Sequence, residues 1–123
     1  MDRARKRIGL DEVKEFRWSH SSITIAVLDS GIGRHPDLEG KCILFKDFVN
    51  HREAPYDDCG HGTHVCGILC GSGELSAGKY RGILPTARLV VGKVLDKAGN
   101  GQADCMAEAL EWILKYHKKY DIR

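Results

Sequence analysis

Short apolar runs alternate with polar, glycine-rich stretches along the chain, and this pattern predicts its strands. Residues 23–28 form a continuous run of apolar and β-branched side chains, which is typical of a strand buried on both faces of a parallel sheet. Residues 42–49 and 87–95 contain further apolar runs and predict two more strands. The first run ends at Asp29. Because open α/β sheets bind ligands at the carboxyl ends of their strands, Asp29 is a candidate site residue.

Two segments predict helices. Small and apolar residues from Gly62 or Thr63 to about Cys70 favour a buried helix, which the glycine-rich residues 71–73 end. Residues 103–119 follow a helical period, with charged positions mostly opposite an apolar face. That face consists of Ala103, Met106, Ala107, Leu110, Ile113 and Leu114. A short helix is also expected at residues 10–16, with Trp18 as an anchor. Strands that alternate with helices predict an α/β fold with a parallel sheet.

The size and charge of the chain limit the classes of function that we expect for it. Its 123 residues form one domain at most, and the formal charge of +2 comes from 19 basic and 17 acidic residues. There is no long run of like charges, so we expect no nucleic-acid partner. No apolar segment has the length of a signal peptide or a membrane span, so we expect a cytoplasmic protein without membrane contact.

The five cysteines are an odd number and include no Cys-x-x-Cys pair. In a chain without an export signal, this favours free thiols in a reducing compartment over a disulfide framework. A second interpretation is a transition-metal cluster near residue 60. Its ligands would be Cys59, His61, His64, Cys66 and Cys70. Because the spacing matches none of the common zinc patterns, we expect no metal site.

The stretch from Asp57 to Gly67 is the strongest candidate for chemistry. It holds His61 between glycines just before an apolar run, and imidazole exchanges a proton near neutral pH. Taken alone, an aspartate after a strand is commonly a turn or cap residue, and a histidine beside glycines is commonly a loop residue. Together, Asp29 and His61 are stronger candidates for catalysis than either residue alone.

Together the two stretches resemble the aspartate and histidine motifs of the subtilisin-like serine proteases, in the family's order. The motifs are residues 23–32, ITIAVLDSGI, and residues 57–67, DDCGHGTHVCG. The resemblance implies a three-layer α/β fold with a mostly parallel sheet. It also implies that Asp29 orients and stabilises His61, which acts as general base and then acid. Ser30 corresponds to a small hydroxyl residue that donates to the Asp29 carboxylate, and His64 to a packed structural residue.

The resemblance also includes a segment that binds substrate in the family and a segment that binds calcium in relatives. Residues 93–102 resemble the family segment that pairs with polypeptide substrate as an added strand, so Gly99, Asn100 and Gly101 are candidate substrate-binding residues. The alternative is a flexible turn. Asp37 matches an aspartate that in relatives helps to bind stabilising calcium. Because residues 71–80 offer only Glu74 as a second carboxylate, we expect no calcium site and no other cofactor.

The family's nucleophile motif, Gly-Thr-Ser, and its oxyanion asparagine region are absent from the 123 residues. We therefore interpret residues 1–22 as an amino-terminal extension and residues 23–123 as the first half of a peptidase domain. Loss of the nucleophile alone costs about a millionfold in turnover, so we expect no peptide hydrolysis by this chain alone. The missing half would come from the same polypeptide or from a partner chain. The alternative function is a non-catalytic remnant or peptide-binding module.

Overall fold

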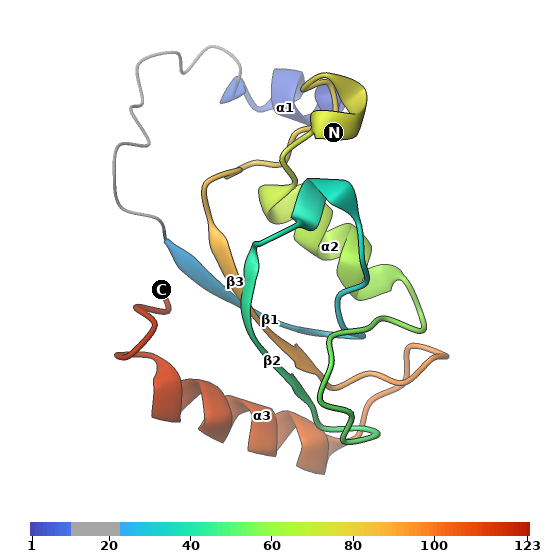
Figure 1. The fold of residues 1–123 in the computed structure, drawn as a ribbon, viewed down its shortest axis with the longest axis vertical. Helices are drawn as coiled ribbons and strands as arrows, with labels where there is room; N and C mark the ends of the chain where they lie inside the picture. Colours follow the sequence, from blue (N-terminus) through green and yellow to red (C-terminus); the bar gives the residue numbers. More distant parts are fainter. Residues whose placement is uncertain (11–22) are drawn as a thin grey trace.

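Three parallel strands form the centre of the computed structural model, which describes residues 1–10 and 23–123 (Figure 1). They are β1 (Thr24–Asp29), β2 (Cys42–Asp47) and β3 (Arg88–Lys93), and their order across the sheet is β1-β3-β2. β2 and β3 lie within the runs that the apolar pattern predicted, and β1 extends one residue past its run, to Asp29. In the register of the sheet, Lys93 pairs with Asp29 on one side and with Asp47 on the other. The carboxyl ends of the strands therefore meet at one edge.

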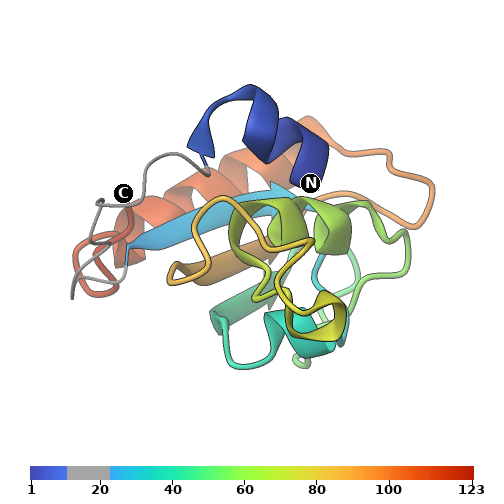
Figure 2. The same cartoon turned by 90° about the horizontal axis from the view of Figure 1, so that it is seen from above.

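Two helices cover the two faces of the sheet. The view in Figure 2 places α2 (His61–Cys70) in front of the strands and α3 (Ala103–Tyr116) behind them. Side chains alternate along β3, so Leu89 and Val91 pack in the core beneath α2, while Val90 packs in the core beneath α3. This arrangement confirms the predicted three-layer α/β fold with a parallel sheet.

The prediction of the packed face of α3 was wrong in most positions. Met106, Leu110 and Leu114 are 38%, 52% and 68% exposed. The buried residues of the helix are Ala109 and Trp112. The helix has two apolar stripes, and the stripe that holds Trp112 packs on the sheet. An indole ring buries a large apolar area, and Trp112 also makes an edge contact with the ring of Phe48 at 5.6 Å between centroids.

The remaining elements are short. Helix α1 spans Asp2–Arg7, and single helical turns of the 3-10 type lie at Pro36–Leu38 and Glu74–Ser76. The helix expected at residues 10–16, with Trp18, falls almost entirely outside the described residues. At the other end, Ile122 bridges to Thr24 in parallel, so the end of the chain lies beside β1.

Candidate active site

The side chains of Asp29 and His61 are hydrogen bonded to each other. Asp29 is the last residue of β1, His61 is the first residue of α2, and the two lie 32 positions apart in the chain. The distances from Nδ1 of His61 to the two carboxylate oxygens are 2.8 and 3.0 Å. The Asp29 side chain is 12% exposed and the His61 side chain is 63% exposed. The fold thus joins the two predicted residues in an arrangement that solvent reaches.

This contact fixes the proton on the imidazole ring. A carboxylate only accepts hydrogen bonds, so Nδ1 of His61 carries the hydrogen and Nε2 is left as an acceptor. The hydrogen bond to Asp29, followed by the charge of that carboxylate, raises the pKa of His61 above its ordinary value. The pair therefore has the geometry of a general base held in one tautomer by a carboxylate.

Ser30 connects the end of β1 to the start of α2. Its backbone N–H donates to Asp29 at 2.7 Å, but its hydroxyl donates to Asp57 at 2.8 Å and accepts from the N–H of Gly62 at 2.8 Å. Ser30 therefore donates to the Asp29 carboxylate as expected of the residue, but through its backbone N–H and not through its hydroxyl. Both oxygens of Asp29 already face the ring of His61, and the Asp57 carboxylate lies within reach of the hydroxyl.

Asp57 is a central acceptor that the sequence analysis did not single out. Its carboxylate accepts from the Ser30 hydroxyl, from the N–H groups of Cys59 and Gly60, and from both the N–H and the hydroxyl of Thr63. It thereby satisfies backbone donors at the start of α2, which have no partners within the helix. Burial opposes a charge at Asp57, but these hydrogen bonds outweigh it and hold the pKa well below its usual range. The position of Asp57, four residues before His61, was the feature of the sequence that could have indicated this role.

Two glycines allow the chain after β1 to lie close to α2 and to the loop that precedes α2. A Cβ atom on Gly62 would lie 2.2 Å from the carbonyl oxygen of Gly31, and one on Gly31 would lie 2.0 Å from the carbonyl oxygen of Tyr56. Gly31 also has a φ of 122°, a backbone conformation that glycine adopts readily. Larger residues at these two positions would separate the elements that hold Asp29 and His61.

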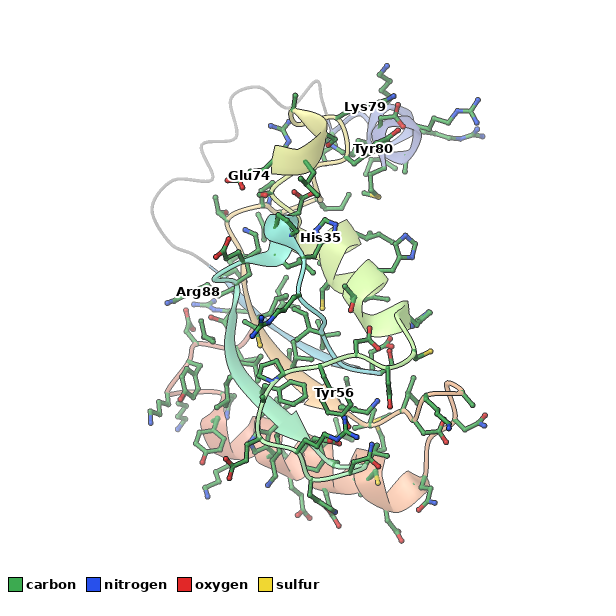
Figure 3. The ribbon with its side chains drawn as sticks, turned by 45° about the vertical axis from the view of Figure 1, so that its right-hand side comes forward. His35, Tyr56, Glu74, Lys79, Tyr80 and Arg88 are labelled. Atoms are coloured by element: carbon green, nitrogen blue, oxygen red, sulfur yellow. The ribbon has the colours of Figure 1, made fainter. Side chains whose placement is uncertain are left out.

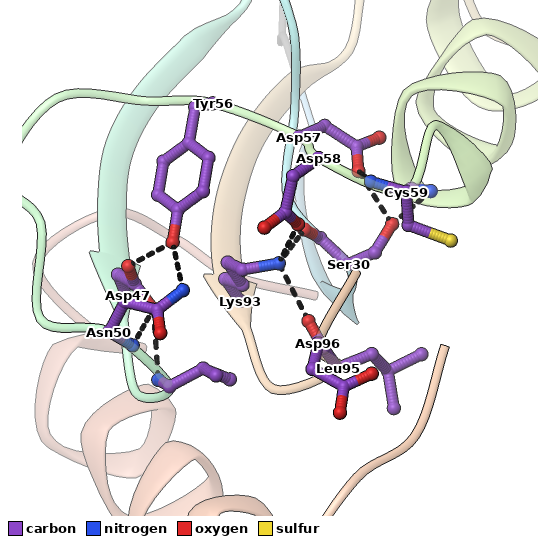
Figure 4. Close-up of polar contacts among 12 residues, drawn as sticks. Ser30, Asp47, Asn50, Tyr56, Asp57, Asp58, Cys59, Lys93, Leu95 and Asp96 are labelled. Atoms are coloured by element: carbon purple, nitrogen blue, oxygen red, sulfur yellow. Dashed lines mark hydrogen bonds and ion pairs between the residues drawn. The ribbon is translucent and has the colours of Figure 1, made fainter. Parts of the chain in front are cut away.

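A buried lysine lies at the same edge of the sheet. Lys93 ends β3, and its ammonium group donates to the carboxylate of Asp58 and to the carbonyl groups of Ser30 and Leu95 (Figure 4). In the sequence, Lys93 was predicted only to begin the substrate segment. Its position as a lysine at the end of an apolar strand could have indicated the buried contacts.

The predicted substrate segment is an exposed loop after β3. Asp96 and Asn100 are joined by a backbone hydrogen bond of 2.8 Å, which makes Leu95 and Gly101 a bridged pair of the kind that lacks hydrogen bonds between its own members. In such a pair, the N–H and C=O groups of Gly101 point away from Leu95. Gly99, Asn100 and Gly101 are all exposed.

His64 differs from its expected structural role because it is exposed. The sheet side of α2 buries Gly62, Cys66 and Cys70, which follow each other at intervals of four, and His64 points elsewhere. All five cysteines are free. Among the described residues, no three His, Cys, Asp or Glu side chains form a group suited to a metal ion. Burial raises the pKa of Cys66 to about 12 and that of Cys70 to about 11, so neither thiol ionises readily.

The segment that matches a calcium site in relatives, around Asp37, packs against the turn at Glu74–Ser76. Figure 3 shows Glu74, Lys79 and Tyr80 near the top of the view, His35 below them and Tyr56 further down. One carboxylate oxygen of Asp37 accepts from the N–H of Leu75 at 3.1 Å. Calcium takes six to eight oxygen ligands, and Glu74 has the only carboxylate within residues 71–80. The donor set therefore does not fit calcium, and we propose no site there.

Known proteins resemble this chain over the stretch that includes Asp29 and His61. The model of the Subtilase family matches residues 20–122. Serine protease AprX from Bacillus subtilis is 49% identical over 96 residues, which cover 78% of this chain and 22% of that protein. Thermitase from Thermoactinomyces vulgaris is 36% identical over 93 residues, which cover 75% of this chain and 33% of thermitase.

A solved structure extends the similarity to three dimensions. A cold adapted subtilisin-like serine proteinase superposes with a TM-score of 0.65 at 29% sequence identity, over 76% of this chain and 32% of that one. The chain thus spans a third or less of the length of these relatives. Among the described residues, no helix combines the length and hydropathy needed to cross a membrane.

Proposed function

The chain belongs to the Subtilase family, and from this membership we propose that it supplies the aspartate and histidine of a serine endopeptidase site. Asp29 and His61 are the two residues. The hydrogen bond of 2.8 Å between them is the observation that carries the proposal. The raised pKa of His61 supports it, because a stabilised imidazolium is what proton transfer from a serine requires.

In the proposed reaction, Nε2 of His61 takes a proton from a serine hydroxyl as the serine attacks a peptide carbonyl. The same nitrogen then gives that proton to the leaving amine, while Asp29 stabilises the charged ring. The serine and the donor to the oxyanion lie outside residues 1–123, in the same polypeptide or in a separate chain. The 123-residue chain alone therefore hydrolyses no peptide bond.

The substrate in this proposal is an extended polypeptide that pairs with the loop after β3. The outward N–H and C=O groups of Gly101 support this, because main-chain pairing binds an added strand without selecting its sequence. Gly99 and Asn100 shape the loop. Its exposure leaves room for a substrate strand beside it.

A hybrid enzyme tests the proposal. Residues 20–122 would replace the matching segment of the AprX serine protease, which supplies the remaining part of a protease chain. We expect the hybrid to hydrolyse peptides, and we expect Asp29→Asn to lower kcat by about 10⁴-fold. His61→Ala should cause a larger loss, of about 10⁶-fold in kcat. Asp104→Asn, at an exposed position of α3, should leave kcat unchanged.

Two results would contradict the proposal. One is a folded hybrid whose activity survives Asp29→Asn. The other is a folded hybrid that binds peptide but does not cleave it, which would favour a peptide-binding module instead.

A further inference from the structure

Lys93 has an unusual environment for a lysine, because its side chain is fully buried. Its Nζ atom donates to Asp58, to the Ser30 carbonyl and to the Leu95 carbonyl, each at 2.7 Å. An ammonium group has three donors, so each has a partner. Because a buried charge is costly unless it is paired and hydrogen bonded, this geometry is strongly constrained.

The three acceptors belong to three different parts of the proposed site. Ser30 follows Asp29, Asp58 lies three residues before His61, and Leu95 begins the loop that carries the proposed substrate-pairing glycine. The labels in Figure 4 place these groups around Lys93 at the carboxyl ends of the strands. One side chain thus joins the aspartate, the histidine and the substrate segment.

Leu95 is attached to the Asp29 corner through both of its backbone groups. Its N–H donates to the carbonyl oxygen of Asp29 at 3.2 Å, and its own carbonyl accepts from Lys93, which also binds Ser30. The orientation of the peptide group that follows Leu95 therefore depends on the lysine.

Beyond Leu95, the loop is held together by its own bonds. The side chain of Asp96 accepts from the N–H groups of Ala98 and Asn100, and its carbonyl accepts from the N–H of Gly99. Since these bonds lie inside the loop, they fix its shape but not its direction relative to the sheet. At the β3 end of the loop, the bonds of Leu95 to Asp29 and Lys93 fix that direction.

We infer that Lys93 is a positioning residue, which holds the substrate-pairing loop in register with the Asp29–His61 pair. This inference rests on the proposed function. Lys93 touches neither substrate nor the reacting atoms and acts through Leu95. Its loss therefore weakens binding of substrates that extend along the loop, and leaves short substrates that do not reach Gly101 much less affected.

The kinetic test compares a tetrapeptide substrate with a single-residue ester in the hybrid enzyme. We expect Lys93→Met to raise KM for the tetrapeptide by about tenfold and to change kcat/KM for the ester by less than about threefold. Lys118→Met removes an exposed lysine and is the matched control, which should change neither value. An equal loss for both substrates would overturn the inference, because a purely structural defect lowers both alike.

Hydrogen exchange in the 123-residue chain tests the same idea without activity. We expect Lys93→Met to speed exchange of the Leu95 and Asp96 amides by about tenfold, with Val90 and Val91 in the centre of β3 unchanged. Unchanged exchange at Leu95 and Asp96 would overturn the inference. If Lys93→Met unfolds the chain, hydrogen exchange in Asp58→Ala provides the test instead. The Asp58 side chain is 33% exposed, and its removal should shift the same amides by about threefold.

The two tests separate the two proposals. A hybrid that folds and binds peptide but does not cleave it, together with the expected faster exchange at Leu95 and Asp96 in Lys93→Met, would reject the endopeptidase function and retain the role of Lys93 in holding the loop. An active hybrid in which Lys93→Met affects both substrates equally would do the reverse.

Discussion

Thr63 donates two hydrogen bonds to Asp57, one from its backbone N–H at 2.8 Å and one from its hydroxyl at 2.6 Å. Through them the loop before α2 is closed onto the first turn of the helix that begins with His61. The same carboxylate accepts from Ser30 on β1. The stability of the fold and the position of the histidine therefore depend on one acidic side chain.

We expect Asp57→Ala to lower the free energy of unfolding by about 3 kcal/mol, because it removes a helix cap and leaves partly buried donors without acceptors. Urea unfolding of the 123-residue chain measures this. Glu53→Ala, at an exposed position of the same loop, is the control and should change stability by less than about 0.5 kcal/mol. Equal midpoints for the two variants would show that the cap contributes nothing.

Asp57 also predicts how stability depends on pH. Its pKa in the folded chain lies below the ordinary value, so the folded state binds a proton less readily than the unfolded state. The stabilisation is present above about pH 4 and is lost as pH falls below it, toward the folded pKa. We expect urea midpoints to decline below about pH 4 and to decline less steeply in Asp57→Asn. A parallel decline in both proteins would contradict this assignment.

The raised pKa of His61 is open to direct measurement. In an NMR titration of the 123-residue chain, we expect the ring of His61 to titrate above about pH 6.5. In Asp29→Asn the midpoint should move down, since the bond and the charge that hold the proton are lost. The sign for folding is opposite to that of Asp57: stabilisation is complete below the unfolded pKa and is lost as pH rises through the folded one. Asp104→Asn should leave the His61 curve in place.

The apolar pattern was sufficient to locate β1, β2, β3 and both long helices, because apolar runs and helical periods mark such elements even where, as in α3, the predicted stripe is not the buried one. It did not give the contacts of Lys93 or Asp57. Lys93 and Ser30 are 63 positions apart, and Ser30 and Asp57 are 27 apart. Contacts between residues so far apart can be predicted only when the order of the strands is known. The family motifs supplied Asp29 and His61, but not the contact of the Ser30 hydroxyl with Asp57.

The error on α3 has a testable consequence. Trp112 is 8% exposed and packs against Phe48 and Tyr116, whereas Leu110 is 52% exposed. We expect Trp112→Ala to cost about 3–5 kcal/mol and Leu110→Ala less than about 1 kcal/mol in this chain. Urea unfolding of both variants measures the difference. Similar losses would mean that the stripe predicted from sequence packs as well as the stripe that holds Trp112.

The close approach of α2 to β1 gives the sharpest matched pair of variants. A Cβ atom on Gly62 would meet the carbonyl oxygen of Gly31 at 2.2 Å, and because that oxygen belongs to the backbone, the helix must move away. His61 precedes Gly62, and Asp29 lies two residues before Gly31. We therefore expect Gly62→Ala to lengthen the bond between His61 and Asp29 and to lower the NMR titration midpoint of His61.

Gly67→Ala lies on the same helix, where nothing is within 4 Å of the added Cβ. Alanine favours helix more than glycine by about 0.5–1 kcal/mol, so this variant should be more stable and should keep the His61 titration unchanged. Gly62→Ala should instead lose about 1–3 kcal/mol through overpacking. If Gly62→Ala matched Gly67→Ala in stability and titration, close contact between α2 and β1 would not be what holds His61 against Asp29.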